Sequence, residues 1–293
     1  MRFRTLGDVR VGAVGFGTMP LSIEGRPDAA RAVATVHAAL DAGVTLLDTA
    51  DSYHPPGGAP GEGELLVAGA LASYGGRTDD VLVATKGGRG RTADGGWTVD
   101  GRPWHLRRAA EASARRLGST PIGLYQLHKP DPAVPYAESL GAVRELLDAG
   151  TVRLAGISNV DTAQILLARE ILGDRLVSVQ NRYSPAVRES EPELRLCAGL
   201  GLAFLPWSPL GGISRSSLDG ASSQEEDGGF GAFHRVARAR GVSPQRVALA
   251  WLLTRSETVL PIPGASRPAS VRDSAAAADL DLGAGELAEL NGR

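Results

Sequence analysis

Four polar side chains follow three neighbouring apolar runs of the chain and could together transfer a proton. One run ends at Asp48, with Tyr53 five residues later, and the next two runs end at Lys86 and His128. A parallel strand that is covered on both faces collects its polar groups at its end, where α/β folds place their chemistry. We therefore expect these four side chains to meet at one end of a sheet.

The grouping indicates a general acid. A tyrosine phenol has a pKa of about 10, and a lysine charge within about 4–6 Å lowers it by roughly one to three units. Asp48 would keep Lys86 charged, and His128 would orient a carbonyl oxygen or relay a proton. Tyr53 would then protonate a carbonyl oxygen as the carbonyl receives a hydride. No metal is required, because the histidines lack ligand spacing and the chain has one cysteine.

Each of the four residues also has a structural interpretation. A single aspartate after a strand is commonly a helix cap or a turn former, a single histidine is commonly structural, and a single lysine is commonly a surface cation. Their occurrence after three consecutive strands favours the functional interpretation. Later runs end in further polar or aromatic residues, at Ser158-Asn159, at Gln180-Asn181 and at Trp207-Ser-Pro-Leu210.

The elements that must position these residues alternate regularly. Apolar runs and helical patterns alternate eight times, which predicts a single (β/α)8 TIM-barrel domain over residues 1–293, with a doubly wound open sheet as the competing fold. Gly12, Gly15 and Gly17 lack the spacing of a dinucleotide-binding turn, which argues against the open sheet. A β-hairpin over Arg2–Val11 is expected to close the barrel bottom. The expected barrel strands are 13–17, 44–47, 81–85, 122–127, 152–157, 176–180, 202–205 and 258–261.

Composition places the chain among ordinary globular proteins. The sequence has 43% hydrophobic and 22% charged residues, a net charge of -2 and no basic block, so nucleic acid and membrane surfaces are not expected partners. The only cysteine, Cys197, excludes an internal disulfide. The N-terminus has no apolar segment typical of a signal peptide, and no apolar run reaches membrane-spanning length. We expect a cytoplasmic protein.

Three glycine-rich stretches are expected to be loops. Residues 54–62 and 87–103 follow strands and should lie on the functional rim. Residues 211–231 are rich in serine, glycine and acidic side chains and are expected to be mobile, with no role assigned.

Six motifs carry a family resemblance that covers the chain from end to end. The motifs are Gly15-Phe-Gly-Thr-Met19, Leu47-Asp-Thr-Ala-Asp-Ser-Tyr53, Ala84-Thr-Lys-Gly-Gly88, Leu127-His-Lys-Pro130, Gly156-Ile-Ser-Asn159 and Ile262-Pro-Gly-Ala-Ser266. In these motifs the chain resembles an aldo-keto reductase of the bacterial type. The resemblance implies a TIM barrel that binds a nicotinamide cofactor in extended form without a Rossmann domain. It also implies a catalytic set of Asp48, Tyr53, Lys86 and His128 with Tyr53 as the acid.

The resemblance also implies a set of cofactor-binding residues. Ser158, Asn159 and Gln180 would hold the nicotinamide carboxamide, and Trp207 would lie against the ring. The remaining candidates are Thr18 and Met19 near the nicotinamide ribose, Ser208 and Leu210 near the pyrophosphate, and Ser266, Arg267, Ser270, Arg272 and Asp273 near an adenosine 2′-phosphate. Gly17, Asp48, Gly264 and Ser274 are further cofactor-binding candidates.

The 2′-phosphate segment departs from the family pattern. Many members have a lysine or arginine near position 264 or 265 and a Glu-Asn pair where Asp273-Ser274 stands. A preference for NADPH therefore depends mainly on Arg267, Ser266 and Arg272, and NADH stays possible. Because the sequence ends soon after its last predicted helix, we expect a long C-terminal loop over the substrate pocket to be absent or very short.

Several functions are compatible with these residues. The leading hypothesis is NADPH-dependent reduction of an aldehyde or ketone. The alternatives are an NAD(P)-dependent sugar or alcohol dehydrogenase that works in the oxidative direction and a nicotinamide-sensing accessory subunit with little turnover. A Schiff-base lyase that uses Lys86 is disfavoured, because Asp48 would keep the amine charged. The expected partner is a small carbonyl or sugar substrate, and monomer and homo-oligomer both stay open.

Overall fold

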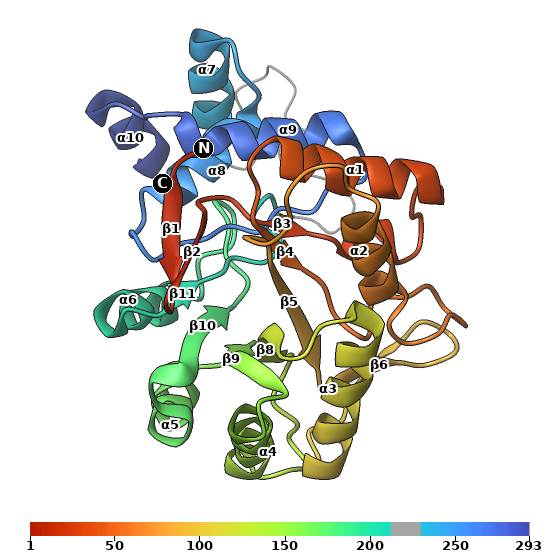
Figure 1. Ribbon diagram of the computed structural model, residues 1–293. Helices are drawn as coiled ribbons and strands as arrows, with labels where there is room; N and C mark the ends of the chain where they lie inside the picture. Colours follow the sequence, from red (N-terminus) through yellow and green to blue (C-terminus); the bar gives the residue numbers. More distant parts are fainter. Residues whose placement is uncertain (212–229, 293) are drawn as a thin grey trace.

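The computed structural model describes residues 1–211 and 230–292, and its centre is a curled parallel sheet surrounded by helices (Figure 1). Seven strands are hydrogen-bonded in the order β3-β4-β5-β8-β9-β10-β11, so nearly all neighbours in the sheet are also neighbours in the chain. This sequential parallel order is that of a barrel rather than of a doubly wound sheet. The strands are β3 (Phe16–Gly17), β4 (Leu46–Asp48), β5 (Leu82–Gly87), β8 (Ile122–Leu127), β9 (Val152–Ser158), β10 (Leu176–Gln180) and β11 (Ala203–Phe204).

The eighth position of the barrel differs from the expectation. Residues 258–261 form no regular strand, but isolated parallel bridges join Val259 to Phe204 and Gly264 to Gly17. Pro261 and Pro263 have no N–H group to donate to a ladder, which explains the interruption. Their carbonyl oxygens still accept hydrogen bonds from Gly15 at 3.0 Å and Gly17 at 3.1 Å. The segment thereby connects the two edges of the sheet and completes the ring.

An antiparallel hairpin precedes the barrel. Strands β1 (Phe3–Leu6) and β2 (Val9–Gly12) pair around a turn at Gly7. Leu6 and Val11 belong to the buried cluster that also contains apolar side chains of β4, β5, β8 and β9. These contacts are consistent with a hairpin at the barrel bottom, and closure of that end stays a prediction.

The helices lie outside the sheet, and local sequence signals fix their ends. Asp28 caps the first helix through the Arg31 amide at 2.8 Å, and Asp161 forms a capping box with Gln164 at the start of another. No helix within the described residues is long and apolar enough to cross a membrane. The helices are α1 (Ala29–Asp41), α2 (Glu62–Ala72), α3 (Pro103–Leu117), α4 (Tyr136–Asp148), α5 (Thr162–Leu172), α6 (Glu191–Leu200), α7 (Gly231–Arg240), α8 (Pro244–Leu253), α9 (Pro268–Ala275) and α10 (Ala284–Asn291).

The glycine-rich stretch 87–103 is not the plain loop that the sequence predicts. It contains a second antiparallel hairpin, β6 (Arg89–Arg91) and β7 (Trp97–Val99), in which Arg91 pairs with Trp97. Gly95 adopts a φ of +89° in the connecting turn, which a residue with a side chain rarely does. Stretch 54–62 is irregular as expected, and α2 begins at its last residue. Most of the third stretch, residues 212–229, lies outside the described residues, so its expected mobility stays a prediction.

Candidate active site

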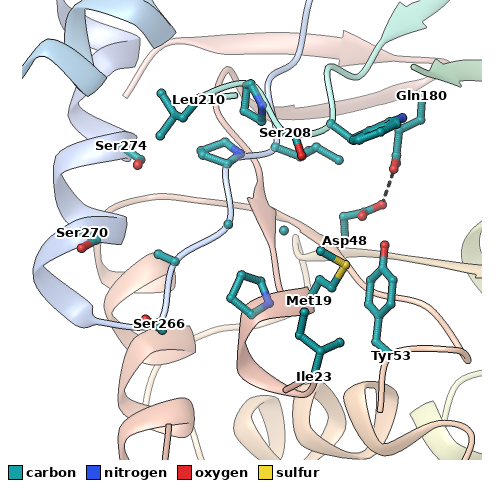
Figure 2. Close-up of a pocket in the computed structure, with 18 of the residues that line it drawn as sticks. Met19, Ile23, Asp48, Tyr53, Gln180, Ser208, Leu210, Ser266, Ser270 and Ser274 are labelled. Carbon is teal, nitrogen blue, oxygen red and sulfur yellow. Dashed lines mark hydrogen bonds between the residues drawn. The ribbon is translucent and has the colours of Figure 1, made fainter. Parts of the chain in front are cut away.

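The carboxyl ends of the strands surround a cavity of about 750 Å³ that extends to α9 (Figure 2). Most of the residues expected at the site line it, whereas Thr18, Lys86 and Arg272 do not. The expected residues that line it are Gly17, Met19, Asp48, Tyr53, His128, Ser158, Asn159, Gln180, Trp207, Ser208, Leu210, Gly264, Ser266, Arg267, Ser270, Asp273 and Ser274.

Lys86 lies behind the cavity wall and connects Asp48 to Tyr53. Its ammonium group is completely buried and donates to Asp48 Oδ1 at 2.5 Å, to the Thr49 carbonyl at 2.8 Å and to Tyr53 Oη at 3.1 Å. Burial alone would lower the pKa of Lys86, but the charges and hydrogen bonds of Asp48 and Tyr53 prevail, and the pKa is raised. Lys86 is therefore charged, as the sequence predicts.

Tyr53 presents its hydroxyl to the cavity from the turn after β4, and its side chain is 7% exposed. The pKa of Tyr53 is raised, and burial is the largest cause. The Lys86 charge lowers this pKa, but by less than burial raises it, and the Asp48 charge raises it further. The expectation of a lowered pKa is thus wrong. Its physical reason is that Asp48 offsets much of the Lys86 charge, while the dry surroundings penalise a phenolate. Tyr53 holds its proton at neutral pH.

His128 faces Tyr53 edge-on, with ring centroids 5.8 Å apart and an interplanar angle of 81°. Its Nδ1 atom lies 3.5 Å from the Ser52 hydroxyl. Burial, followed by the charges of Lys86 and Arg89, lowers the pKa of His128 well below its usual value. The imidazole is therefore neutral at neutral pH, and it still has one N–H that can donate a hydrogen bond to a carbonyl oxygen.

The second oxygen of Asp48 is held by two amides. Gln126 donates to Asp48 Oδ2 at 3.0 Å, and Gln180 donates to the same atom at 2.9 Å (Figure 2). Gln180 also donates to Gln126 Oε1 at 3.2 Å. Sequence reasoning missed Gln126, although a glutamine in the otherwise apolar run of β8 was an available signal. The pair fixes the carboxylate that orients Lys86.

Ser158 and Asn159 form a connected polar edge of the cavity. The Ser158 hydroxyl donates to the Gln180 carbonyl at 2.6 Å, and the Asn159 amide donates to the His128 carbonyl at 2.9 Å and to Ser158 Oγ at 3.0 Å. Asn159 has a φ of +59°, in the left-handed region that asparagine tolerates better than most residues. Through Gln180 and Asp48 the same network links Tyr53 and Lys86 to the predicted carboxamide contacts.

Trp207 and Ser208 form the neighbouring wall. The indole nitrogen of Trp207 is buried and has no hydrogen-bond partner within the described residues. Ser208 has a φ of +47°, and the Gly211 amide closes a turn on its carbonyl at 2.8 Å. A serine in this conformation is uncommon, and such residues concentrate at ligand-binding segments.

The far end of the cavity is formed by α9 and the residues before it. Ser270, Asp273 and Ser274 lie at helical spacing on the face towards the cavity, whereas Arg272 is exposed on another face. The structure therefore gives no support to Arg272 as a phosphate ligand. Asp273 accepts hydrogen bonds from Arg246 at 2.6 and 3.1 Å, so its charge is compensated. Arg267 has no acidic partner within the described residues.

The second hairpin adds lining residues that sequence reasoning missed. Arg89 and Trp97 of this hairpin line the cavity, and so does Glu24, which lies before α1. The available signal was the glycine-rich stretch 87–103, which was expected on the functional rim without any single residue being selected.

Comparison with known proteins agrees with this arrangement. A sequence model described as "Aldo/keto reductase family" matches residues 13–292. Pyridoxine 4-dehydrogenase of Escherichia coli is 33% identical and aligns with 98% of this chain and 96% of its own length. The 6-dehydroglucose reductase of Novosphingobium aromaticivorans is 33% identical over 94% of this chain and 90% of its own length.

Solved structures give the same result. An aldo/keto reductase from Klebsiella pneumoniae, in complex with NADP and acetate, superposes with a TM-score of 0.78 at 29% identity and covers 99% of this chain and 94% of its own. Glycerol dehydrogenase from Gluconobacter oxydans gives 0.82 at 26% identity, with 99% and 94% covered. On the family match and on relatives above 30% identity along nearly its whole length, this chain belongs to the aldo/keto reductase family of oxidoreductases.

Proposed function

We propose that the protein reduces an aldehyde or ketone to an alcohol with NADPH, and that Tyr53 is the general acid. The observation that carries this proposal is the buried series Asp48–Lys86–Tyr53, in which two hydrogen bonds of 2.5 and 3.1 Å end at a hydroxyl that faces the cavity. Such a series supplies a protonated acid beside a fixed positive charge.

The residues around the cavity fit a nicotinamide dinucleotide. The side-chain nitrogens of Asn159 and Gln180 donate hydrogen bonds, whereas their side-chain oxygens accept none within the described residues and are available to the amino group of a carboxamide. Trp207 offers a ring face and an unpartnered N–H. A Klebsiella pneumoniae relative with 30% identity is bound to NADPH, which supports the same choice here. When bound, NADPH supplies the hydride that reduces the carbonyl carbon.

The side chains of this protein would donate the proton that the substrate oxygen needs. Tyr53 stays protonated at rest because burial raises its pKa. As the substrate oxygen gains negative charge, it becomes the stronger base and takes the Tyr53 proton. Lys86, at 3.1 Å, then stabilises the phenolate that is left, and Asp48 keeps Lys86 aligned. The neutral His128 donates a hydrogen bond to the same substrate oxygen.

The end of the cavity at α9 supports NADPH over NADH. Arg267 carries a charge that no described acid neutralises, and it lines this end of the cavity. Ser266 and Ser270 add hydroxyl groups to the same end (Figure 2). A cation with hydroxyl donors suits a 2′-phosphate, whereas an acid there would suit a free ribose hydroxyl. The one acid on this face, Asp273, is already paired with Arg246.

The oxidative direction uses the same groups in reverse, and the names of two relatives describe dehydrogenases. We propose the reductive direction because Tyr53 holds its proton at neutral pH, which is the form that carbonyl reduction requires. The accessory-subunit alternative is disfavoured, because a protein that only senses a nicotinamide has no need of a buried proton donor.

A substrate panel tests the proposal. Aldehydes, ketones, sugars and alcohols are offered with NADPH, NADH and the two oxidised cofactors, and nicotinamide absorbance is followed. We expect NADPH oxidation with carbonyl compounds, slower oxidation of NADH and weak turnover of alcohols near neutral pH. Tight NADPH binding without turnover of any compound would replace the proposal by the sensing role.

A further inference from the structure

One arginine at the reactive end of the cavity has no hydrogen-bond or ion-pair partner among the residues that the structure describes. Arg89 lies on β6 and lines the cavity together with Tyr53 and His128. Its guanidinium is close enough to both residues that its charge acts on the pKa of His128 and on the Tyr53 phenol. None of the motifs that carry the family resemblance includes Arg89.

The second hairpin holds this guanidinium in place. Arg89 and Arg91 are two residues apart on β6 and therefore project to the same side of the strand. The Cζ atoms of Arg89 and Arg91 lie 4.4 and 4.5 Å from the centroid of the Trp97 ring. Stacking on an indole fixes the plane of a guanidinium without using its N–H donors.

The two arginines differ in their hydrogen bonds. Arg91 donates through both of its terminal nitrogens, to both carboxylate oxygens of Glu24 and to the carbonyls of His54 and Gly95 at 2.7 and 2.8 Å. Only its Nε atom has no partner within the described residues. Arg89 makes no hydrogen bond or ion pair in the part of the chain that the structure describes, and its Nε atom is buried without a partner. Donors that are ordered but unused are available to a ligand.

The charges at this end of the cavity do not cancel without a ligand. Glu24 is paired with Arg91, Asp48 is paired with Lys86, and His128 is neutral. Arg89 remains as one positive charge, and burial lowers its pKa, although an arginine stays protonated. Placing a cation in a cavity without a counter-ion costs free energy, which an incoming anion recovers.

We propose that Arg89 binds an anionic group of the substrate, so that the protein reduces carbonyl compounds that carry a carboxylate or a phosphate. This inference rests on the proposed function and identifies its substrate class. The planar fork of a guanidinium matches either anion through two parallel hydrogen bonds. Because Arg89 and Tyr53 line the same cavity, the anionic group and the reacting carbonyl belong to one small molecule.

Matched substrate pairs test this proposal. The carboxylate arm compares 4-carboxybenzaldehyde with its methyl ester and succinic semialdehyde with butanal, and the phosphate arm compares glyceraldehyde 3-phosphate with glyceraldehyde. The measured quantity is the ratio of kcat/KM for the anionic over the neutral member. Because both values come from the same preparation, partial unfolding of a variant cancels in the ratio. The arm with the larger ratio identifies the anion.

Arg89→Met is the decisive variant. We expect the anionic-over-neutral ratio of the preferred pair to fall by about 10- to 100-fold, as the loss of charge-assisted hydrogen bonds predicts. Arg89→Lys should retain part of the ratio, because it keeps the charge without the fork. Arg102→Met is the matched control, since Arg102 also stacks on a tryptophan, Trp104, at 4.7 Å but does not line the cavity. Its ratio should equal that of the wild type.

The outcomes separate the two proposals. If neutral and anionic carbonyls are both reduced and Arg89→Met leaves their ratio unchanged in both arms, Arg89 only packs on Trp97 and the substrate inference is wrong, while the proposed reduction stands. If no carbonyl compound is reduced by the wild type, the proposed function fails and the substrate inference fails with it.

Discussion

The Nζ atom of Lys86 lies 3.1 Å from the phenolic oxygen of Tyr53, yet the pKa of that phenol is raised. Burial of the phenol is the largest cause, and Asp48, which lies 2.5 Å from the same ammonium, adds to the rise. Lys86 therefore does not deprotonate Tyr53 in advance. In the proposed reaction it acts late, when the proton has left and the phenolate needs a counter-ion.

The amides on Asp48 lead to the first prediction. Gln126→Leu removes one of the two donors to Asp48 Oδ2 and leaves a buried carboxylate oxygen with Gln180 alone. We expect the free energy of unfolding to fall by about 1.5–3 kcal/mol. Because Gln126 does not line the cavity, kcat should fall more than the KM of the carbonyl substrate rises. Denaturant unfolding and steady-state kinetics measure both effects. If Gln126→Leu kept the wild-type free energy of unfolding and the wild-type kcat, the Gln126 amide would not contribute to the position of Asp48.

Asp51 gives a prediction on pH. Its side chain is buried, its Oδ1 atom has no partner within the described residues, and burial followed by the Glu64 charge raises its pKa well above the ordinary value. The folded protein thus holds this proton at pH values where the unfolded chain has lost it. Stability from this group is present at low pH and is lost as pH rises from about 4 towards the folded pKa.

In Asp51→Asn the side chain at position 51 cannot ionise, so the variant should not lose stability from this group as pH rises. The stability difference between Asp51→Asn and the wild type should grow with rising pH in favour of the variant, by up to about 1.4 kcal/mol per pH unit inside the window. Urea unfolding between pH 4 and pH 8 measures it. A difference that stays constant across this range would contradict the raised pKa of Asp51.

The far end of the cavity gives a prediction on cofactor choice. Arg267→Ala should weaken NADPH binding by roughly 10- to 100-fold, as expected for lost charge-assisted hydrogen bonds, and should change NADH binding little. Arg272→Ala is the matched control, because Arg272 is exposed on the same helix but does not line the cavity. Fluorescence titration with each cofactor compares the variants. Equal weakening of both cofactors by Arg267→Ala would remove the argument for a 2′-phosphate site.

The positions of the four reactive residues could be predicted from sequence because of strand geometry. Asp48, Lys86 and His128 stand at or directly after the ends of β4, β5 and β8, which are neighbours in one parallel sheet. Parallel order brings such ends together whatever the details of the loops. The catalytic roles of these residues and the cofactor contacts stay predictions.

Other features depend on information that a local pattern does not carry. The sign of the Tyr53 pKa shift depends on burial and on the distance from Asp48 to Lys86, neither of which is visible in the sequence. The regular strand expected at 258–261 is absent because Pro261 and Pro263 interrupt the ladder. The glycines of stretch 87–103 predict a loop, so the sequence does not indicate the hairpin β6–β7. The position of Arg89, which lies on that hairpin, could therefore not be predicted.

The most direct test of the proposed mechanism is the proton donor itself. Tyr53→Phe removes one hydroxyl and keeps the ring that packs against His128. General acid catalysis contributes typically 10²–10⁴-fold, so kcat for carbonyl reduction should fall by about that factor while the dissociation constant of NADPH stays within about twofold of the wild type. If Tyr53→Phe reduced carbonyl substrates with the same kcat as the wild type, Tyr53 would not be the proton donor and the proposed mechanism would be wrong.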